Sequence, residues 1–128
     1  MKLLLDTHTV LWFWWNDPQL SKTALRLICD PANQKFVSWA TPWEVSIKVS
    51  QKRLDLGGSP GGIFHQHMLR NHFEWLGLRE EHFDVLAAMP FHHKDPFDRM
   101  IVAQSSWESI PLISADAQLD AYGITRIW

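Results

Sequence analysis

The chain has 128 residues, of which 46% are hydrophobic and 20% charged, and it predicts one globular domain that buries about two-thirds of its unfolded surface. The formal net charge is −2, from 12 basic and 14 acidic side chains, which argues against a general nucleic-acid coat protein because such proteins are strongly basic. The single cysteine, Cys29, excludes an internal disulfide framework and indicates a reducing compartment.

The amino-terminal segment contains no signal for secretion or membrane insertion. Only three leucines separate Lys2 from Asp6, too few for the apolar region of a signal peptide. The apolar run Leu11–Trp15 is too short to span a bilayer. We therefore expect a cytoplasmic protein without membrane association.

Short apolar runs alternate with helical patterns along the chain. In chain order, the sequence predicts a strand at Lys2–Asp6, a helix at Val10–Trp15, a helix from the Ser21 cap to Asp30, a strand at Lys35–Ser38, a helix opened by Thr41, a helix at Ile63–Phe73, a weak strand at Trp75–Leu78, a helix at Arg79–Met89, a helix from the Asp95 cap to about Trp107, and strands at Pro111–Ser114 and Ile124–Trp128. Strands that alternate with helices predict a single α/β domain over residues 1–128, with a mostly parallel sheet.

Two of the predicted helices begin with the same pattern of cap, proline, aromatic residue and acid: Asp95-Pro96-Phe97-Asp98 and Thr41-Pro42-Trp43-Glu44. Proline is well tolerated at the first helical position, where its missing N–H would be unpaired. One interpretation is that each tetrapeptide is a capping box, in which the acid folds back on the N–H of the cap. The other is that the two acids serve a common site.

Two further patterns lack the residues that their function would require. Residues 57–62 are rich in glycine but lack the Gly-Lys-Ser/Thr ending of a phosphate-binding loop, so they predict a flexible connection. The histidines His65, His67 and His72 could suggest zinc. However, residues two apart do not share a helix face, and no cysteine completes the set, so we expect solvated or interface histidines.

Four acids fall at the ends of predicted elements. Asp6 ends the first strand, Glu44 and Asp98 open helices, and Asp116 lies two residues after the Pro111–Ser114 strand. Ligands of open α/β sheets bind beyond the carboxyl ends of the strands. Carboxylates gathered there repel one another unless one is protonated or a cation is bound. Oxygen ligands without cysteine favour Mg²⁺ or Mn²⁺ over Zn²⁺.

Four ordered segments carry a family resemblance: Leu3-Leu4-Leu5-Asp6-Thr7-His8, Trp43-Glu44-Val45-Ser46-Ile47-Lys48, residues 93–104 with Asp-Pro-Phe-Asp-Arg at 95–99, and Ser114-Ala115-Asp116. Together they resemble the motifs of a PIN domain, in particular the VapC-like ribonuclease toxins of bacterial type II toxin–antitoxin systems. The resemblance runs from Lys2 to Trp128.

The resemblance implies a metal-dependent endoribonuclease that acts on RNA, has a cognate antitoxin protein as partner and forms a homodimer. It implies an acidic, metal-binding site of Asp6, Glu44, Asp98 and Asp116, of which the fourth acid is the least constant in the family. The supporting residues expected near this site are Thr7, Asp95, Arg99 and Ser114. The basic groups expected to contact the RNA backbone are Lys48, Lys52, Arg53 and Lys94, together with Arg99.

Two other functions are compatible with parts of the sequence. The segment Leu-Leu-Leu-Asp-Thr-His also resembles the nucleophile loop of haloacid-dehalogenase phosphatases, but His8 replaces the second acid of that loop. A catalytically silent module with the same fold, acting through protein partners, is the second alternative. The eight tryptophans and the absence of a basic excess support it, because exposed tryptophans are common at protein interfaces.

Overall fold

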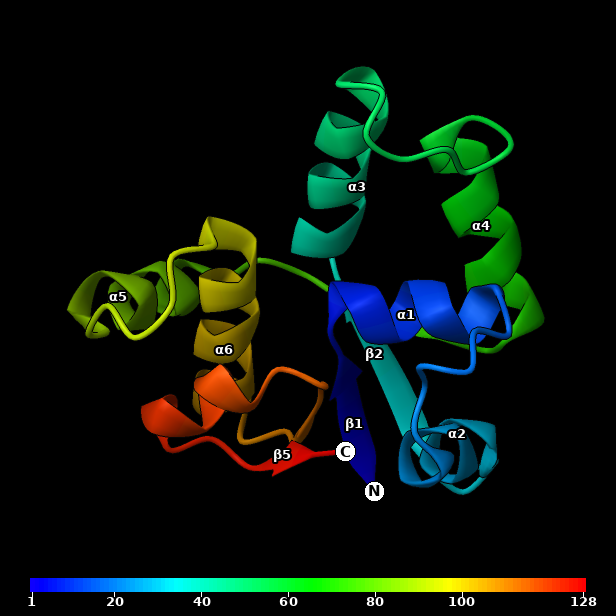
Figure 1. The fold of residues 1–128 in the computed structure, drawn as a ribbon. Coiled ribbons are helices and arrows are strands. Elements are labelled where there is room, and N and C mark those ends of the chain that lie inside the picture. Colours follow the sequence, from blue (N-terminus) through cyan, green and yellow to red (C-terminus); the bar gives the residue numbers. More distant parts are fainter.

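A computed structural model describes residues 1–128, and Figure 1 shows how its elements are arranged. The elements in chain order are β1 (Lys2–Leu5), α1 (Thr7–Trp14), α2 (Lys22–Cys29), β2 (Gln34–Ser38), α3 (Ala40–Ser50), α4 (Pro60–Arg70), β3 (Glu74–Leu76), α5 (Glu80–Ala88), α6 (Pro96–Glu108), β4 (Leu112–Ile113), the 3₁₀ helix η1 (Ala117–Tyr122) and β5 (Arg126–Ile127). The expected α/β class is confirmed.

The five strands form one sheet in the order β3-β2-β1-β4-β5, and every pair is parallel. β1 lies at the centre, with Leu5 opposite Val37 of β2 on one side and opposite Ile113 of β4 on the other. The chain therefore proceeds in opposite directions from β1 toward the two sheet edges. This change of direction creates a topological switch point at the carboxyl ends of β1 and β4, where α/β folds commonly bind ligands.

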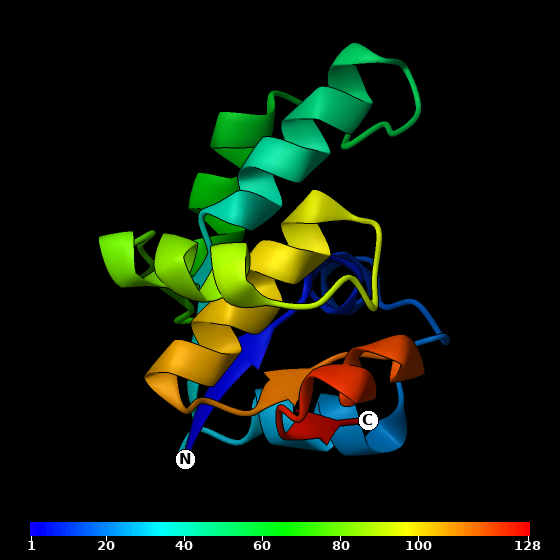
Figure 2. The ribbon, with the colours of Figure 1, turned by 90° about the vertical axis from the view of Figure 1, so that its left-hand side faces the viewer.

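Helices cover both faces of the sheet, as the two views in Figures 1 and 2 show. Successive side chains of a strand point to opposite faces. Accordingly, Leu4 packs in a core with α6 residues such as Ile101, whereas Leu3 and Leu5 pack in a second core with Val10 of α1. Because both faces are buried, β1 is an uninterrupted apolar run rather than an alternating one.

Helices α3 and α4 project together beyond the carboxyl edge of the sheet (Figures 1 and 2). A third, smaller core of Leu11, Val45 and Phe64 joins them to α1. The first turn of α3 thus stays close to the sheet, while its last turn extends away from it. No helix in the chain has the length and hydropathy that a membrane crossing requires.

The starts of two helices differ from the sequence-based prediction because local capping overrides the apolar pattern. α1 begins at Thr7 instead of Val10, since Asp6 caps it by accepting a hydrogen bond from the backbone N–H of Thr9. α4 begins at Pro60, with Ser59 as its cap, so the predicted flexible connection at residues 57–62 is partly helical. Gly61 and Gly62 occupy the first turn of α4, so this turn lacks the apolar periodicity by which a helix is predicted from sequence.

Candidate metal centre

The carboxyl ends of the two central strands each deliver an acid to the switch point. Asp6 follows β1 directly and is 5% exposed, while Asp116 follows β4 after Ser114 and Ala115. Asp116 caps η1 by accepting a hydrogen bond from the N–H of Gln118 at 3.0 Å. Its backbone N–H donates to the Ser114 hydroxyl at 3.1 Å. The expected positions of these acids at one sheet edge follow from the all-parallel sheet.

Helix α3 and the start of α6 bring three more acids to the same place. One carboxylate oxygen from each of Glu44, Asp95 and Asp98 lies within 4.8 Å of the others. Asp95 is also the cap of α6, where it accepts hydrogen bonds from the N–H groups of Phe97 and Asp98. The predicted Asp95 cap, with Pro96 at the first helical position, is therefore confirmed.

The capping box predicted for Thr41 and Glu44 is wrong. α3 begins at Ala40 with Trp39 at the cap position, and no side chain caps it. The buried Glu44 instead accepts a hydrogen bond from the Thr7 hydroxyl at 2.8 Å and one from the Lys48 ammonium at 2.8 Å. Thr41 contacts the Thr7 hydroxyl at 3.2 Å. Glu44 is thus held toward β1 and α1 and away from its own backbone.

Asp6 and Glu44 are the two acids of the site that are buried. Burial raises the pKa of the Asp6 carboxyl group, and hydrogen bonds from Ser114 and Thr9 counteract part of that shift. Asp6 is not among the oxygens within 4.8 Å of one another, but its charge contributes to raising the pKa of Asp98. It therefore borders the cluster and acts on it through space.

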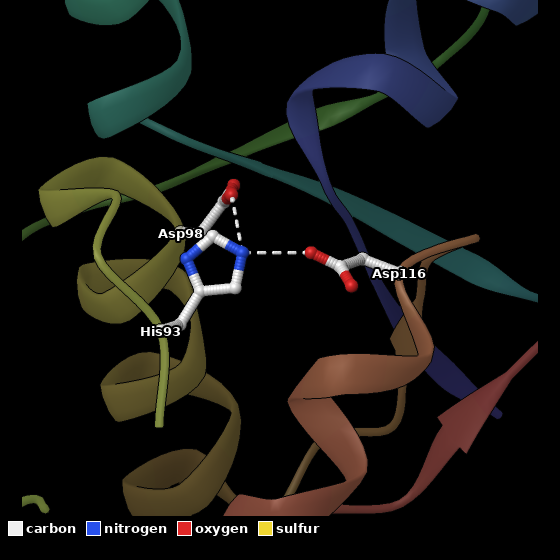
Figure 3. Close-up of side chains that lie close together, drawn as sticks. All are labelled: His93, Asp98 and Asp116. Atoms are coloured by element: carbon white, nitrogen blue, oxygen red, sulfur yellow. Dashed lines mark hydrogen bonds and ion pairs between the residues drawn. The ribbon is translucent and has the colours of Figure 1, made fainter. Parts of the chain in front are cut away.

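His93 is a member of the site that sequence reasoning missed. Its Nε2 lies 2.7 Å from Asp116 Oδ2 and 3.6 Å from Asp98 Oδ2, so the imidazole bridges the two acids (Figure 3). Its Nδ1 accepts the backbone N–H of Asp95 at 3.1 Å. In the neutral imidazole the proton is therefore on Nε2, which donates to Asp116. The signal in the sequence was the position of His93, two residues before the cap of α6.

The electrostatic cost of this arrangement is concentrated on Asp98. Burial raises the pKa of Asp98 to about 7, the negative charges of Asp95, Glu44 and Asp6 add to the increase, and His93 opposes it. A carboxyl group that ionises only near neutral pH reports burial combined with mutual repulsion. A divalent cation relieves such repulsion, and a donor set made mainly of carboxylate oxygens suits a hard ion.

Arg99 is placed away from the acids. Its buried guanidinium donates to the backbone oxygens of Pro90, Leu86 and Met89 and to the Tyr122 hydroxyl. It also lies 4.1 Å from the centroid of the Phe91 ring. The structure thus gives Arg99 a packing role, in which it ties the end of α5 to α6.

The loop before α6 is fixed by a single hydroxyl group. Tyr122, at the end of η1, accepts the backbone N–H of His92 at 3.1 Å and of His93 at 2.9 Å. The same oxygen accepts a hydrogen bond from Arg99 at 3.0 Å. Three donors therefore converge on one oxygen and set the position of the loop that carries His93 and Asp95.

The predicted RNA-binding cations occupy three different environments. Lys48 forms an ion pair with Glu44 at 2.8 Å, so its charge balances a site acid. Lys52 and Arg53 are exposed beyond the end of α3, and Lys94 is exposed on the loop before α6. Arg53 lines a pocket of about 270 Å³ between α1 and α3, together with Thr7, His8 and Trp12, and this pocket borders the Thr7–Glu44 hydrogen bond.

The raised pKa of Asp98 predicts how stability changes with pH in the absence of divalent ions. The folded protein retains the Asp98 proton up to about pH 7, whereas the unfolded chain loses it near pH 4. The free energy of unfolding should therefore fall as pH rises from about 4 to 7, by at most about 4 kcal/mol at about 1.4 kcal/mol per pKa unit. Urea unfolding in chelator at pH 5 and pH 8 measures this change.

Asp98→Asn is the matched comparison for this measurement, because the amide cannot ionise. The variant should be more stable than the wild type at pH 8 and should lose much of the pH dependence. Asp120 and Glu81 have lowered pKa values at exposed positions, but they are present in both proteins and cancel in the difference. If the free energy of unfolding had the same pH dependence in both proteins, a raised pKa of Asp98 would be contradicted.

Comparison with known proteins identifies the family and the fold. The family model described as PIN domain matches residues 3–124. No curated protein sequence matches significantly. A chain of the VapBC2 complex from Rickettsia felis, bound to a DNA fragment from its promoter, is similar in fold, with a TM-score of 0.73 and 12% identity over 99% of this chain and 98% of that chain.

Two further solved structures show the same architecture. The sarcin-ricin loop cleaving toxin VapC20 from Mycobacterium tuberculosis has a TM-score of 0.67 and 14% identity over 98% of both chains. FitAcB from Neisseria gonorrhoeae has a TM-score of 0.66 and 18% identity over 98% of this chain and 96% of that chain. At these identities the structures establish the fold, and the family match covers nearly the whole sequence. The chain belongs to the PIN domain family.

Proposed function

We propose that the chain is a metal-dependent endoribonuclease and the toxin of a type II toxin–antitoxin pair. The observation that carries the proposal is the convergence of Glu44, Asp95 and Asp98 within 4.8 Å, at the switch point of a PIN domain and beside Asp6 and Asp116. The similar fold of VapC20, a sarcin-ricin loop cleaving toxin, supports RNA as the substrate.

In this proposal Glu44 and Asp98 hold a Mg²⁺ or Mn²⁺ ion, Asp95 lies beside them, and Asp6 and Asp116 flank the site. When bound, such an ion would neutralise the carboxylates, polarise a phosphodiester and make water more acidic. The chain's own side chains orient these ligands. Thr7 donates to one oxygen of Glu44 and Lys48 to the other, while Ser114 lowers the pKa of Asp6 by a hydrogen bond.

RNA would reach the acids between α1 and α3. The 270 Å³ pocket at this position is lined by aromatic and cationic side chains, including Trp12, His8 and Arg53. Phosphates contact Arg and Lys, and bases stack on aromatic rings. We propose Arg53 and Lys52 as backbone contacts on this side, and Lys94 on the other side of the site.

The proposed protein partner is a small cognate antitoxin that presents a basic side chain to the acids. Similarity to the VapBC2 and FitAcB structures supports a two-component system. A homodimer is proposed on family resemblance alone.

The two alternative functions fare differently. The match to the PIN domain family argues against the haloacid-dehalogenase phosphatase. His8, which occupies the position of the second acid in the phosphatase loop, is exposed on α1 next to Trp12. A silent binding module is favoured by the exposed tryptophans, of which Trp43, Trp107, Trp39 and Trp15 are all at least 46% exposed. A module without chemistry, however, would have no use for the repulsion that raises the pKa of Asp98.

Removing a proposed ligand should abolish cleavage while the fold remains. Asp98→Asn and Glu44→Gln should each lower Mn²⁺-dependent cleavage of single-stranded RNA by at least about 100-fold, since even outer partners of a metal site contribute about 10–100-fold. Asp84→Asn, at an exposed position on α5, is the matched control and should retain full activity. Retained cleavage in both ligand variants would reject the proposed site.

Expression in bacteria tests the biological part of the proposal separately. The wild-type chain should arrest growth and Asp98→Asn should not, because arrest depends on the nuclease. Coexpression of a small protein encoded beside this chain should restore growth if that protein is the antitoxin. Colony counts after induction provide the measurement, and equal arrest by the wild type and Asp98→Asn would contradict a nuclease toxin.

The bridge between His93 and Asp116 should act as one unit in ion binding. His93→Ala and Asp116→Asn should each weaken Mn²⁺ binding by about 10-fold, at the lower end of the usual effect of outer partners. The double variant should be no weaker than either single variant, because each change removes the same interaction. Isothermal titration provides the affinities. His92→Ala, at an exposed neighbouring position, serves as control, and additive losses would rule out the bridge.

A further inference from the structure

We infer that Trp43 and Phe97 form a platform on which an unpaired RNA base stacks beside the acids. This inference rests on the proposed ribonuclease function and specifies the substrate as single-stranded RNA. It depends on the position of two aromatic side chains that the acid cluster itself does not use.

The two residues of the platform are the sequence neighbours of two proposed metal ligands. Trp43 precedes Glu44 in the first turns of α3, and Phe97 precedes Asp98 in the first turn of α6. Carboxylate oxygens of Glu44 and Asp98 lie within 4.8 Å of each other. The two helix starts are therefore close together, and their aromatic rings lie at the rim of the same site.

Trp43 is held in place although it faces solvent. Its side chain is 60% exposed, more than any other tryptophan in the chain. The ring centroids of Trp43 and Phe97 are 5.2 Å apart at an interplanar angle of 85°, a favourable edge-to-face contact. Phe97 in turn packs against the core formed by α6 and the sheet. An edge-to-face contact covers at most one face of the indole, so the other face is available to a ligand.

Charge explains why RNA needs such a contact here. The acids repel phosphate, and two nearby cations are already engaged: Lys48 with Glu44 and Arg99 with backbone oxygens. Stacking on an aromatic ring requires no positive charge, and every base has an aromatic face. An aromatic platform therefore supplies affinity at a place where the electrostatic field opposes the substrate backbone.

The geometry favours an unpaired base over a double helix. Bases inside a duplex are already stacked on both faces, whereas splayed bases of loops and single strands stack on Trp and Phe side chains. The other exposed tryptophan near this surface, Trp39, is already stacked on Trp75 at 4.0 Å and 9°. Trp43 has no such aromatic partner on its faces.

The test compares the full chain carrying Trp43→Ala, Trp43→Phe or Trp107→Ala. Binding of a short fluorescein-labelled single-stranded RNA is measured by anisotropy at low ionic strength in chelator, where a metal-dependent nuclease does not cleave. Trp43→Ala should weaken binding by about 5- to 150-fold, the equivalent of about 1–3 kcal/mol for one stacked base. Trp43→Phe should retain most of the affinity. Trp107 is 49% exposed but lies about 15 Å along α6 from Phe97, from ten residues at 1.5 Å each, so its variant should bind like the wild type.

Abasic nucleotides placed one at a time along the RNA make the test specific. At one position the missing base should weaken binding to the wild type but not to Trp43→Ala, because each change removes the same stack. Wild-type affinity in Trp43→Ala, or losses that add at every position, would overturn the inference. An unchanged affinity for RNA combined with an altered oligomeric state in light scattering would also overturn it and assign Trp43 to a protein contact.

Failure of the stacking site can be distinguished from failure of the proposed function. If the wild type and Trp43→Ala cleave RNA equally in Mn²⁺, the nuclease stands and the platform is rejected. If the wild type neither binds nor cleaves RNA, the proposed function fails, and the inference fails with it. Circular dichroism spectra and thermal unfolding of each variant show whether the fold is intact.

Discussion

Mutual repulsion among carboxylates at one edge of a parallel sheet is the constraint on which this site depends. Two unit charges about 4 Å apart interact by about 4 kcal/mol at an effective dielectric constant of about 20. Carboxylate oxygens of Glu44, Asp95 and Asp98 lie within 4.8 Å of each other, and the charge of Asp6 also raises the pKa of Asp98. The chain folds around this unfavourable cluster because the sheet and its two cores position the acids without requiring the acids to attract one another.

Several polar contacts moderate the repulsion without removing it. Lys48 and Thr7 hold the two oxygens of Glu44, and the backbone of α6 donates to Asp95. The imidazole of His93 lies between Asp98 and Asp116. The pKa of Asp98 nevertheless stays raised, because burial and the charges of Asp95, Glu44 and Asp6 outweigh the opposing effect of His93. A bound divalent cation would relieve the repulsion that remains.

The sequence was informative where a local rule coincides with the tertiary structure. The strand before Asp6 and the Asp95–Pro96 helix start could be predicted, because an apolar run and a cap with proline have one favoured structure each. The Thr41 capping box could not be excluded, because the competing partner of Glu44 is Thr7, which lies 37 residues away. His93 was missed for the same reason, since its contact with Asp116 spans 23 residues. The position of the Arg99 side chain likewise depends on backbone oxygens that approach it only when α5 packs against α6.

The Tyr122 hydroxyl shows how the order of a loop can be encoded outside that loop. It holds the backbone N–H groups of His92 and His93, and these bonds do not depend on which side chains residues 92 and 93 carry. The path of the loop backbone therefore depends on the phenol at position 122 as well as on the loop's own residues. A change at position 122 would therefore disturb the placement of His93 and Asp95 without altering any residue of the loop that carries them.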